Sequence, residues 1–391
     1  MTKKQHKTVL IASTCFIDWG GSEELWARTA HLLLEEGTKV IIYKSSIKRT
    51  HPEFEKLVTK GAVLEDWKSS FFVGARVYKK IKRGIYKISG EKKHFLRDHT
   101  ESAFSKVIKK YNPDLIVISQ GINFDGLHHA YQCLLAKTPY VIISQKAVDF
   151  YWPGPSERQY MSKALTHAKA CFFVSNHNKR LTEEQFGIRL DNSQIINNPL
   201  KIARSIPYPS AEKKYKLACV ARLFLLDKGQ DILLRVLAKD KWKQRPLQVS
   251  FIGEGDDLNG LKEMASLLEI TSVEFLGQQN DITELWKFHH ALILPSRSEG
   301  LPLSLVEAMA AGRPSIVTNA GGNAEILEEG ITGFISEIST ESLDAAMERA
   351  WVNKENWESM GMAAAKSISA SFSEASEKKF VNLLNIILHG Q

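Results

Sequence analysis

Two glutamates stand in one short segment of the chain, RSEGLPLSLVEAMAAG (297–312). Glu299 lies in a polar stretch, whereas Glu307 stands within a run of small and apolar residues that has a helical period. A carboxylate buried without a partner carries a large free-energy cost. Glu307 must therefore either face water or receive a ligand.

The start of this predicted helix is a candidate anion site. Pro302 is expected near the first helical position, where its missing N–H is harmless. The unpaired N–H groups from Leu301 to Ser304, with Gly300 just ahead of them, would suit a phosphate or a diphosphate. The same pattern also fits an ordinary amphipathic helix whose polar face, including Glu307, is exposed to solvent.

Two cations are expected at the same edge of the same sheet. In VARLFLLDKGQDILL (220–234) a predicted strand ends at Arg222, and Lys228 opens the next helix. Arginine offers a planar fork and lysine a point charge, and both suit diphosphate oxygens. They also fit ordinary solvated cations of a surface loop.

A pair of glycines follows the first predicted strand, in DWGGSEEL (18–25). Gly20 and Gly21 permit close approach by a ligand, although the G-x-G-x-x-G dinucleotide fingerprint is absent. Glu23 is predicted to be a first-turn residue that the helix dipole stabilises, and not a catalytic group.

Alternating strands and helices must position these residues. In the first half of the chain, strands are predicted at 7–13, 38–43, 111–120, 140–145, 170–176 and 194–200, and the first helix at 22–37. Continuous apolar strands separated by helices indicate a parallel sheet that is covered on both faces.

The pattern is interrupted once and then restarts. Residues 201–214 contain two prolines and little periodicity, which predicts a linker. Further strands are predicted at 216–222, 247–255, 272–277, 291–296 and 314–319. The expected fold is α/β, with two doubly wound, Rossmann-like domains that face a cleft and bind ligands at the carboxyl ends of their strands. The predicted domains are 1–203 and 204–372, and 373–391 is a helix whose apolar stripe packs back on the first domain.

Length and composition limit the class of protein and the kind of ligand that can be expected. The 391 residues exceed what a single core of ordinary size organises. A content of 43% hydrophobic and 25% charged residues is typical of a soluble globular protein, and the formal charge of +8 favours anionic ligands. Four scattered cysteines argue for a reducing cytoplasm and against a disulfide or zinc framework. No run approaches the roughly 20 apolar residues of a membrane span, so a cytoplasmic location is expected.

Several motifs together resemble the retaining GT-B glycosyltransferases of family 4. They are GGSE (20–23), VARLFLLDKG (220–229), FIGEG (251–255), EFLGQ (274–278), GITGFI (330–335) and, above all, SRSEGLPLSLVEAMAAGRPSIVTNAGGNAEIL (296–327). The resemblance runs through most of residues 8–340 and is most specific in 296–327. It implies a GT-B fold and a nucleoside-diphosphate-sugar donor held mainly by the second domain.

The resemblance also implies roles for individual residues. Arg222 and Lys228 would contact the diphosphate, Glu307 would take the ribose hydroxyls, and Glu299 would be the catalytic residue against the donor sugar. Backbone groups after Glu299 would hold the distal phosphate, and Gly21 would lie beside the donor. The two cations would do the work of a metal ion, so neither a metal nor any other cofactor is expected. The implied reaction transfers a hexosyl group, with retention of configuration, to a glycan or lipid-linked acceptor in cell-surface polysaccharide biosynthesis.

One position departs from the family pattern. The family often has a histidine where YVIISQKAVDF (140–150) has Gln145. Glutamine can hydrogen-bond a sugar hydroxyl but cannot shuttle a proton at pH 7. Gln145 therefore remains a candidate donor-binding residue with a changed role.

Two further segments concern the acceptor. Residues 71–97 carry nine Lys and Arg against one Glu, interleaved with aromatic residues. They fit a peripheral contact with the inner face of an anionic membrane, or a solvated helix that packs on its own domain. Nucleic acid is not expected, because no recognition motif accompanies the charge. The loop FYWPGPSERQY (150–160) offers rings for stacking on an acceptor sugar, or for packing.

Other functions of this architecture remain as alternatives. A sugar-nucleotide epimerase needs a proton-abstracting base, and a cofactor-dependent phosphorylase needs a Schiff-base lysine. The sequence places neither. A non-catalytic nucleotide-sugar-binding module would be expected to lack Glu299 or the two cations, and all three residues are present.

Overall fold

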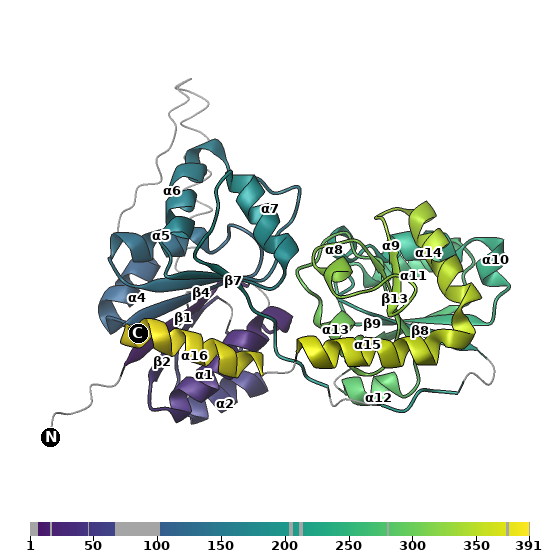
Figure 1. Cartoon of the computed structure of the whole chain (residues 1–391), viewed down its shortest axis with the longest axis horizontal. Helices are drawn as coiled ribbons and strands as arrows, with labels where there is room; N and C mark the ends of the chain where they lie inside the picture. The colour runs from purple at the N-terminus through teal and green to yellow at the C-terminus, as the bar shows by residue number, and fades with distance from the viewer. Residues whose placement is uncertain are drawn as a thin grey trace.

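Two parallel β-sheets form the frame of the molecule (Figure 1). A computed structural model of the chain describes residues 7–15, 18–45, 47–66, 102–202, 206–210, 214–279, 281–372 and 375–390. The first sheet has the strand order β3-β2-β1-β4-β5-β6-β7, and the second has the order β10-β9-β8-β11-β12-β13. Paired strands run parallel in both sheets. The predicted α/β class with two doubly wound sheets is confirmed.

The first domain is built on the first sheet. Its strands are β1 (Thr8–Ser13), β2 (Lys39–Lys44), β3 (Val63–Asp66), β4 (Leu115–Gln120), β5 (Tyr140–Ser144), β6 (Ala170–Phe173) and β7 (Ser193–Ile195). Its helices are α1 (Glu24–Glu35), preceded by the 3-10 turn Gly21–Glu23, then α2 (Pro52–Thr59), α4 (Ala103–Tyr111), α5 (Leu127–Leu135), α6 (Pro155–Thr166) and α7 (Asn176–Phe186).

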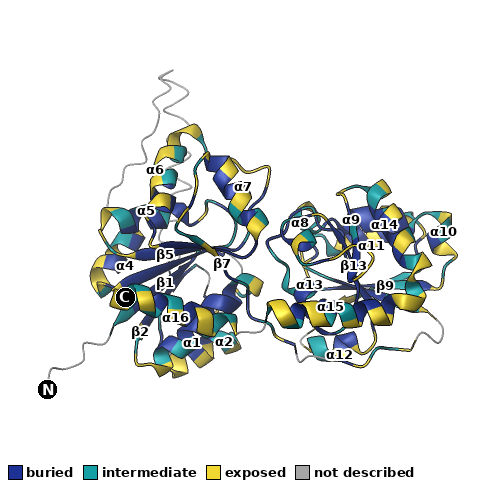
Figure 2. Cartoon of the chain, in the orientation of Figure 1, coloured by how far each residue is buried: buried dark blue, intermediate teal, exposed yellow. Residues whose placement is uncertain are grey.

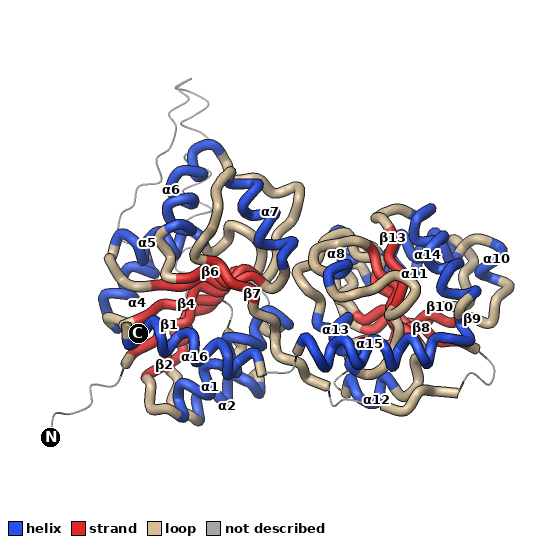
Figure 3. Tube along the Cα trace, in the orientation of Figure 1, coloured by secondary structure: helices blue, strands red, loops and turns tan. Residues whose placement is uncertain are grey.

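The apolar strands are buried on both faces, as their composition requires. In β1 the side chains of Val9 and Ile11 join one hydrophobic core, and those of Leu10 and Ala12 join another on the opposite face of the sheet. All four are at most 1% exposed. Figure 2 shows the strands as the buried centre of each domain, and Figure 3 shows helices on both sides of them.

The second domain repeats this arrangement. Its strands are β8 (Tyr215–Val220), β9 (Leu247–Ile252), β10 (Val273–Gly277), β11 (Ala291–Leu294), β12 (Ser315–Thr318) and β13 (Gly333–Ser336). Its helices are α8 (Leu225–Lys228), α9 (Gln230–Leu237), α10 (Asp240–Lys243), α11 (Leu258–Leu267), α12 (Ile282–Trp286), α13 (Leu303–Ala310), α14 (Thr340–Val352) and α15 (Trp357–Ser371).

The last helix returns to the first domain. Helix α16 (Ser376–His389) packs beside α1 (Figure 1). Phe380 and Leu384 are fully buried in the core of the first domain, where the ring of Phe380 meets that of Phe172 edge-on at 4.9 Å. The apolar side chains of this helix thus cover the sheet of the first domain.

Each sheet contains one point at which the strand order reverses. The reversal lies between β1 and β4 in the first sheet and between β8 and β11 in the second. Ligands of doubly wound sheets bind beyond the carboxyl ends of the strands at such a point. The loops that follow β8 and β11 are therefore the natural place for a site in the second domain.

Two predictions concerned membranes: that the chain has no membrane span, and that residues 71–97 contact a membrane surface. No helix in the described part of the chain is long and apolar enough to cross a membrane. The basic segment 71–97 lies outside the described residues.

Candidate active site

The two loops at the strand-order reversal of the second domain are fastened to each other. The N–H groups of Arg297 and Ser298, which follow β11, donate to the carbonyl oxygen of Asp227 at 2.7 and 3.0 Å. Gly229 ends α8 with φ +59°, and a Cβ at this position would lie 2.1 Å from the carbonyl oxygen of Pro295. The close approach of the two backbones explains why a glycine follows Lys228.

Glu299 and Lys228 meet across these loops. The Lys228 ammonium donates to Oε1 of Glu299 at 2.6 Å, and the Ser296 hydroxyl donates to the same oxygen at 2.7 Å. Glu299 is 5% exposed, and the Lys228 side chain is 16% exposed. Two donors therefore fix the orientation of a nearly buried carboxylate at the carboxyl edge of the sheet.

Arg222 lies in the same loop but not in the same contact. Its side chain is 46% exposed, lies over the ring of Phe224, and has Nη2 3.6 Å from a carboxylate oxygen of Asp227. Asp227 was not among the residues that sequence reasoning selected. It lies between the two predicted cations and contacts one of them directly.

Helix α13 begins one residue later than expected. Pro302 is the N-cap, with φ −69° and ψ 128°, and Leu303 is the first helical residue. The N–H groups of Leu305 and Val306 both bond back to the carbonyl oxygen of Pro302. Among the described residues, the N–H groups of Leu303 and Ser304 have no hydrogen-bond acceptor, which is the arrangement that favours an anion.

The glycine turn after β12 supports the segment in front of this helix. The Gly322 N–H donates to the carbonyl oxygen of Gly300 at 2.7 Å. Gly321 has φ +57°, and a Cβ there would lie 2.1 Å from the carbonyl oxygen of Glu299. Backbone contacts with the glycine turn thus fix the position of residues 299–302, which include half-buried Leu301.

Glu307 is buried, which contradicts the solvent-face alternative. It is 5% exposed on a helix whose neighbouring residues form part of the core. Burial raises the pKa of Glu307 to about 7, Glu24 adds to the rise, and Lys201 and Arg28 oppose it. No described residue makes a hydrogen bond to its carboxylate. The structure therefore presents a buried acceptor whose bonding capacity is unused.

Two loops of the first domain abut the start of α13. A Cβ at Gly21 would lie 3.0 Å from Cδ1 of Leu303, and a Cβ at Gly300 would lie 1.9 Å from the carbonyl oxygen of Gln145. The Gln145 side chain, 6% exposed, exchanges amide hydrogen bonds with Asn198 at 2.8 and 3.3 Å, and its Nε2 donates to the carbonyl oxygen of Ser22 at 3.2 Å. Gly21, Gln145 and the segment 299–304 thus lie together at the junction of the domains.

A second contact between the domains had no signal in the sequence. The carboxylate of Glu325, in the turn after β12, accepts from the N–H groups of Asn176 (2.9 Å) and His177 at the start of α7. A residue of the second domain therefore caps a helix of the first, and its charge suits the helix N-terminus.

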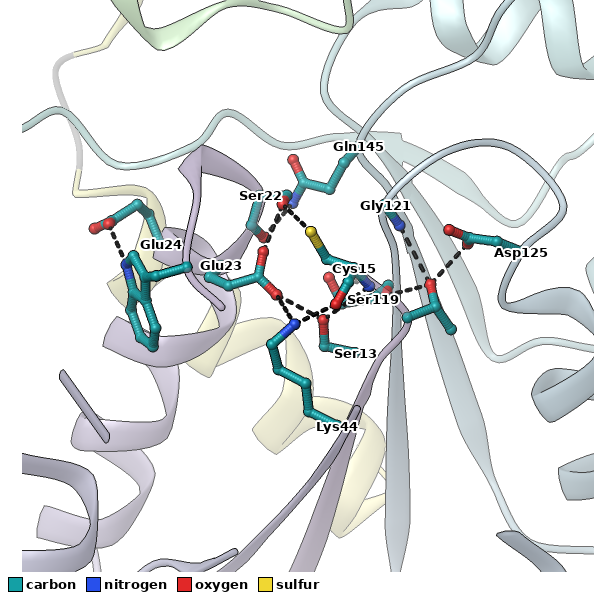
Figure 4. Close-up of polar contacts among 12 residues, drawn as sticks. Ser13, Cys15, Ser22, Glu23, Glu24, Lys44, Ser119, Gly121, Asp125 and Gln145 are labelled. Atoms are coloured by element: carbon teal, nitrogen blue, oxygen red, sulfur yellow. Dashed lines mark hydrogen bonds and ion pairs between the residues drawn. The ribbon is translucent and has the colours of Figure 1, made fainter. Parts of the chain in front are cut away.

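Glu23 lies in the first turn, as predicted, but its carboxylate also has side-chain partners that the sequence did not indicate. It is fully buried at the carboxyl ends of β1 and β2 (Figure 4). Its Oε1 lies 3.4 Å from the buried ammonium of Lys44, and its carboxylate accepts from the hydroxyls of Ser13 (2.6 Å) and Ser22 (2.5 Å). Lys44 also donates to the carbonyl oxygen of Cys15. These partners were not predicted, because the sequence does not show that Lys44, the last residue of β2, lies beneath this loop.

No group of three or more His, Cys, Asp or Glu side chains in the described ranges is arranged to hold a metal ion.

Known proteins resemble this chain in sequence and in structure. Residues 204–367 match the family model of the glycosyl transferases group 1. An uncharacterized glycosyltransferase of Haemophilus influenzae is 31% identical over 176 residues, which are 44% of this chain and 49% of that relative. The match thus spans about half the length of that protein. The O-antigen biosynthesis glycosyltransferase WbnH of Escherichia coli is 26% identical over 295 residues, which cover 73% of this chain and 80% of that one.

The fold itself has close counterparts. The crystal structure of Anabaena HepE in complex with UDP superposes with a TM-score of 0.70 at 15% identity, covering 98% of this chain and 100% of that one. The chain therefore has the GT-B glycosyltransferase fold, and its second domain matches the glycosyl transferases group 1 family.

Proposed function

We propose that this protein is a retaining, metal-independent glycosyltransferase that moves a hexosyl group from a nucleoside-diphosphate sugar to a glycan or lipid-linked acceptor. The observation that carries the proposal is the contact of Lys228, at the end of α8, with Glu299, which lies in the loop leading to a helix whose first N–H groups lack acceptors. The family match of the second domain supports the same reaction class.

The diphosphate would lie at the start of α13. The N–H groups of Leu303 and Ser304 would receive phosphate oxygens, with Lys228 and Arg222 as neighbouring cations. Negative charge grows on the diphosphate as the sugar departs. Donors already fixed there stabilise the transition state more than the ground state.

The ribose would lie against Glu307. A ribose presents two neighbouring hydroxyls, and one carboxylate can accept from both. Burial disfavours the charged form of Glu307 in the free protein. Two hydroxyl donors would restore that form, which makes this residue a suitable partner for a diol.

Glu299 would act at the donor sugar. Glycosyl transfer passes through an oxocarbenium-like state, and an oriented carboxylate both positions the sugar and stabilises the positive charge that develops on it. Retention of configuration and family 4 membership rest on the motif resemblance. With cations of the protein at the diphosphate, we propose that transfer persists in the presence of EDTA.

The loop after β5 would contribute to acceptor binding. Phe150, Tyr151 and Trp152 are 55%, 46% and 61% exposed, and the indole N–H of Trp152 donates to the carbonyl oxygen of Asp149 at 3.0 Å. Exposed rings of this kind suit stacking against the apolar face of a sugar. WbnH acts in O-antigen biosynthesis, so cell-surface polysaccharide assembly is the proposed setting. It would take place in the cytoplasm, with residues 71–97 as the contact to a membrane that carries the acceptor.

The test is binding and transfer by the purified protein. Calorimetry with UDP, GDP, ADP and dTDP should find one nucleotide that binds, and the corresponding nucleotide sugar should support transfer in EDTA. UDP is the first choice, because HepE was crystallised with it. Glu299→Gln should lower turnover by about 100-fold or more and leave nucleotide binding largely intact. An NMR spectrum of the product should show the anomeric configuration of the donor.

The control is Glu263→Gln, at an exposed position of α11. It should change neither quantity. Failure of all four nucleotides to bind, or full activity of Glu299→Gln, would refute the proposed function.

A further inference from the structure

A lysine of the first domain reaches into the donor site of the second. Lys146, two residues after β5, has its ammonium 2.9 Å from Oδ1 of Asp227 in α8. The two side chains are only 14% and 13% exposed. Asp227 immediately precedes Lys228, so this contact joins the two domains beside the Lys228–Glu299 pair.

The backbone around Lys146 is fixed by buried amide side chains. Asn178 accepts from the Ala147 N–H at 3.3 Å and donates to the carbonyl oxygen of Gln145 at 3.5 Å. Asn123 accepts from the Val148 N–H at 3.2 Å. Asn178 and Asn123 are 0% and 6% exposed. Side chains that hold both neighbours of Lys146 preorganise the direction in which it projects.

Lys146 interacts electrostatically with the Lys228–Glu299 pair as well as with Asp227. Burial lowers the pKa of Lys146 below its usual value, Asp227 and Glu299 oppose this, and Lys228 adds to it. Arg222, Lys228 and Lys146 face the two carboxylates Asp227 and Glu299, which leaves one formal positive charge. A diphosphate is the kind of ligand that such an excess attracts.

We propose that Lys146 is a third cation of the diphosphate site, supplied by the first domain and held ready by Asp227. This inference rests on the proposed function. During transfer the bond from the anomeric carbon to the diphosphate oxygen breaks, and its electron pair stays on that oxygen. The acceptor oxygen forms the new bond to the anomeric carbon, and its proton leaves to the nucleoside diphosphate or to water.

Lys146 keeps its own proton throughout and stabilises the negative charge of the departing diphosphate. Because it belongs to the other domain, it is available only when the domains meet as they do here. The contribution of Lys146 is thereby tied to closure of the two domains around the donor.

The test compares Lys146→Met, which keeps the length but removes the charge, with Lys146→Arg. The control is Lys163→Met, at an exposed position of α6. Binding of UDP, UMP and uridine is measured by calorimetry, with the GDP, ADP or dTDP series used instead if the wild type prefers that base. Lys146→Met should bind the diphosphate at least about tenfold more weakly, as expected for loss of a charged hydrogen bond.

Binding of uridine should be unchanged in Lys146→Met, and its kcat should fall at saturating donor. Lys146→Arg should recover most of the lost UDP affinity and most of the lost kcat. If Lys146 only joined the domains, Lys146→Met would change UDP and uridine binding by the same factor or leave both unchanged, and either result would overturn the inference. Lys228→Met separates the two proposals. If it weakens UDP binding while Lys146→Met does not, only the inference fails, whereas a wild-type protein that binds no nucleotide refutes both.

Discussion

Replacing Glu307 by glutamine should change how the stability of the ligand-free protein depends on pH. The folded chain raises the pKa of Glu307 from its ordinary value of 4.5 to about 7, mainly through burial. The folded state therefore binds this proton more tightly than the unfolded state does. The resulting stability is fully present below pH 4.5 and is lost as the pH rises to 7.

The size of the effect follows from those two values. Each pKa unit corresponds to 1.36 kcal/mol, so the wild type should lose about 2 kcal/mol between pH 5.5 and pH 8 from this group alone. Glu307→Gln cannot ionise and should lack this loss. Its stability relative to the wild type should rise by the same amount over that range.

The assay is urea unfolding of the wild type, Glu307→Gln and the exposed control Glu263→Gln at both pH values. Other titrating groups are common to the three proteins and cancel in the differences. A stability difference between the wild type and Glu307→Gln that stays constant from pH 5.5 to pH 8 would refute the burial argument. Nucleotide binding gives a second check, because affinity of the wild type should fall as the pH drops below about 7, whereas the weaker binding by Glu307→Gln should not depend on pH in this range.

Three further predictions concern other parts of the molecule. Trp152→Ala removes an exposed ring and should raise the acceptor KM severalfold with the donor KM unchanged, as steady-state kinetics would show; an altered donor KM would argue against an acceptor role. Glu23→Ala strands the buried ammonium of Lys44 and should destabilise the protein by about 3–5 kcal/mol in urea unfolding, with partial recovery on adding Lys44→Met; a loss below 1 kcal/mol would contradict the buried pair. Gly300→Ala places a methyl group 1.9 Å from the carbonyl oxygen of Gln145 and should reduce turnover by hindering domain contact, while unchanged turnover would mean that the contact is dispensable.

The frame of the fold was predictable because burial leaves a mark on composition. The apolar runs of β1 and β4 could only be strands covered on both sides, and all of β4 and all of β1 except Thr8 are buried. Short elements were predicted less well. Residues 194–200 were expected to be a strand, but β7 ends at Ile195. The order of strands, which fixes where the sheets reverse, depends on crossovers that no local pattern specifies.

The candidate site, too, was predictable in part. Glu299 and Lys228 were expected at one edge of one sheet because each follows a strand that the sequence reveals. The partners that join the two domains were not foreseeable. Lys146 and Asp227 stand in different domains, and neither differs locally from an ordinary surface residue. Glu307 was noticed only because a carboxylate in an apolar run contradicts the pattern, and its burial required the structure to decide.

The return of α16 to the first domain has a consequence for biosynthesis. Domains generally fold as units in the order in which they leave the ribosome. Here the core around Phe380 and Leu384 stays open until the ribosome has made the whole second domain. The first domain therefore keeps an exposed apolar surface along α1 while the second domain is being translated. The second domain is therefore completed before the first, although its synthesis begins later. The surface along α1 is thus a natural place for a chaperone to act during synthesis.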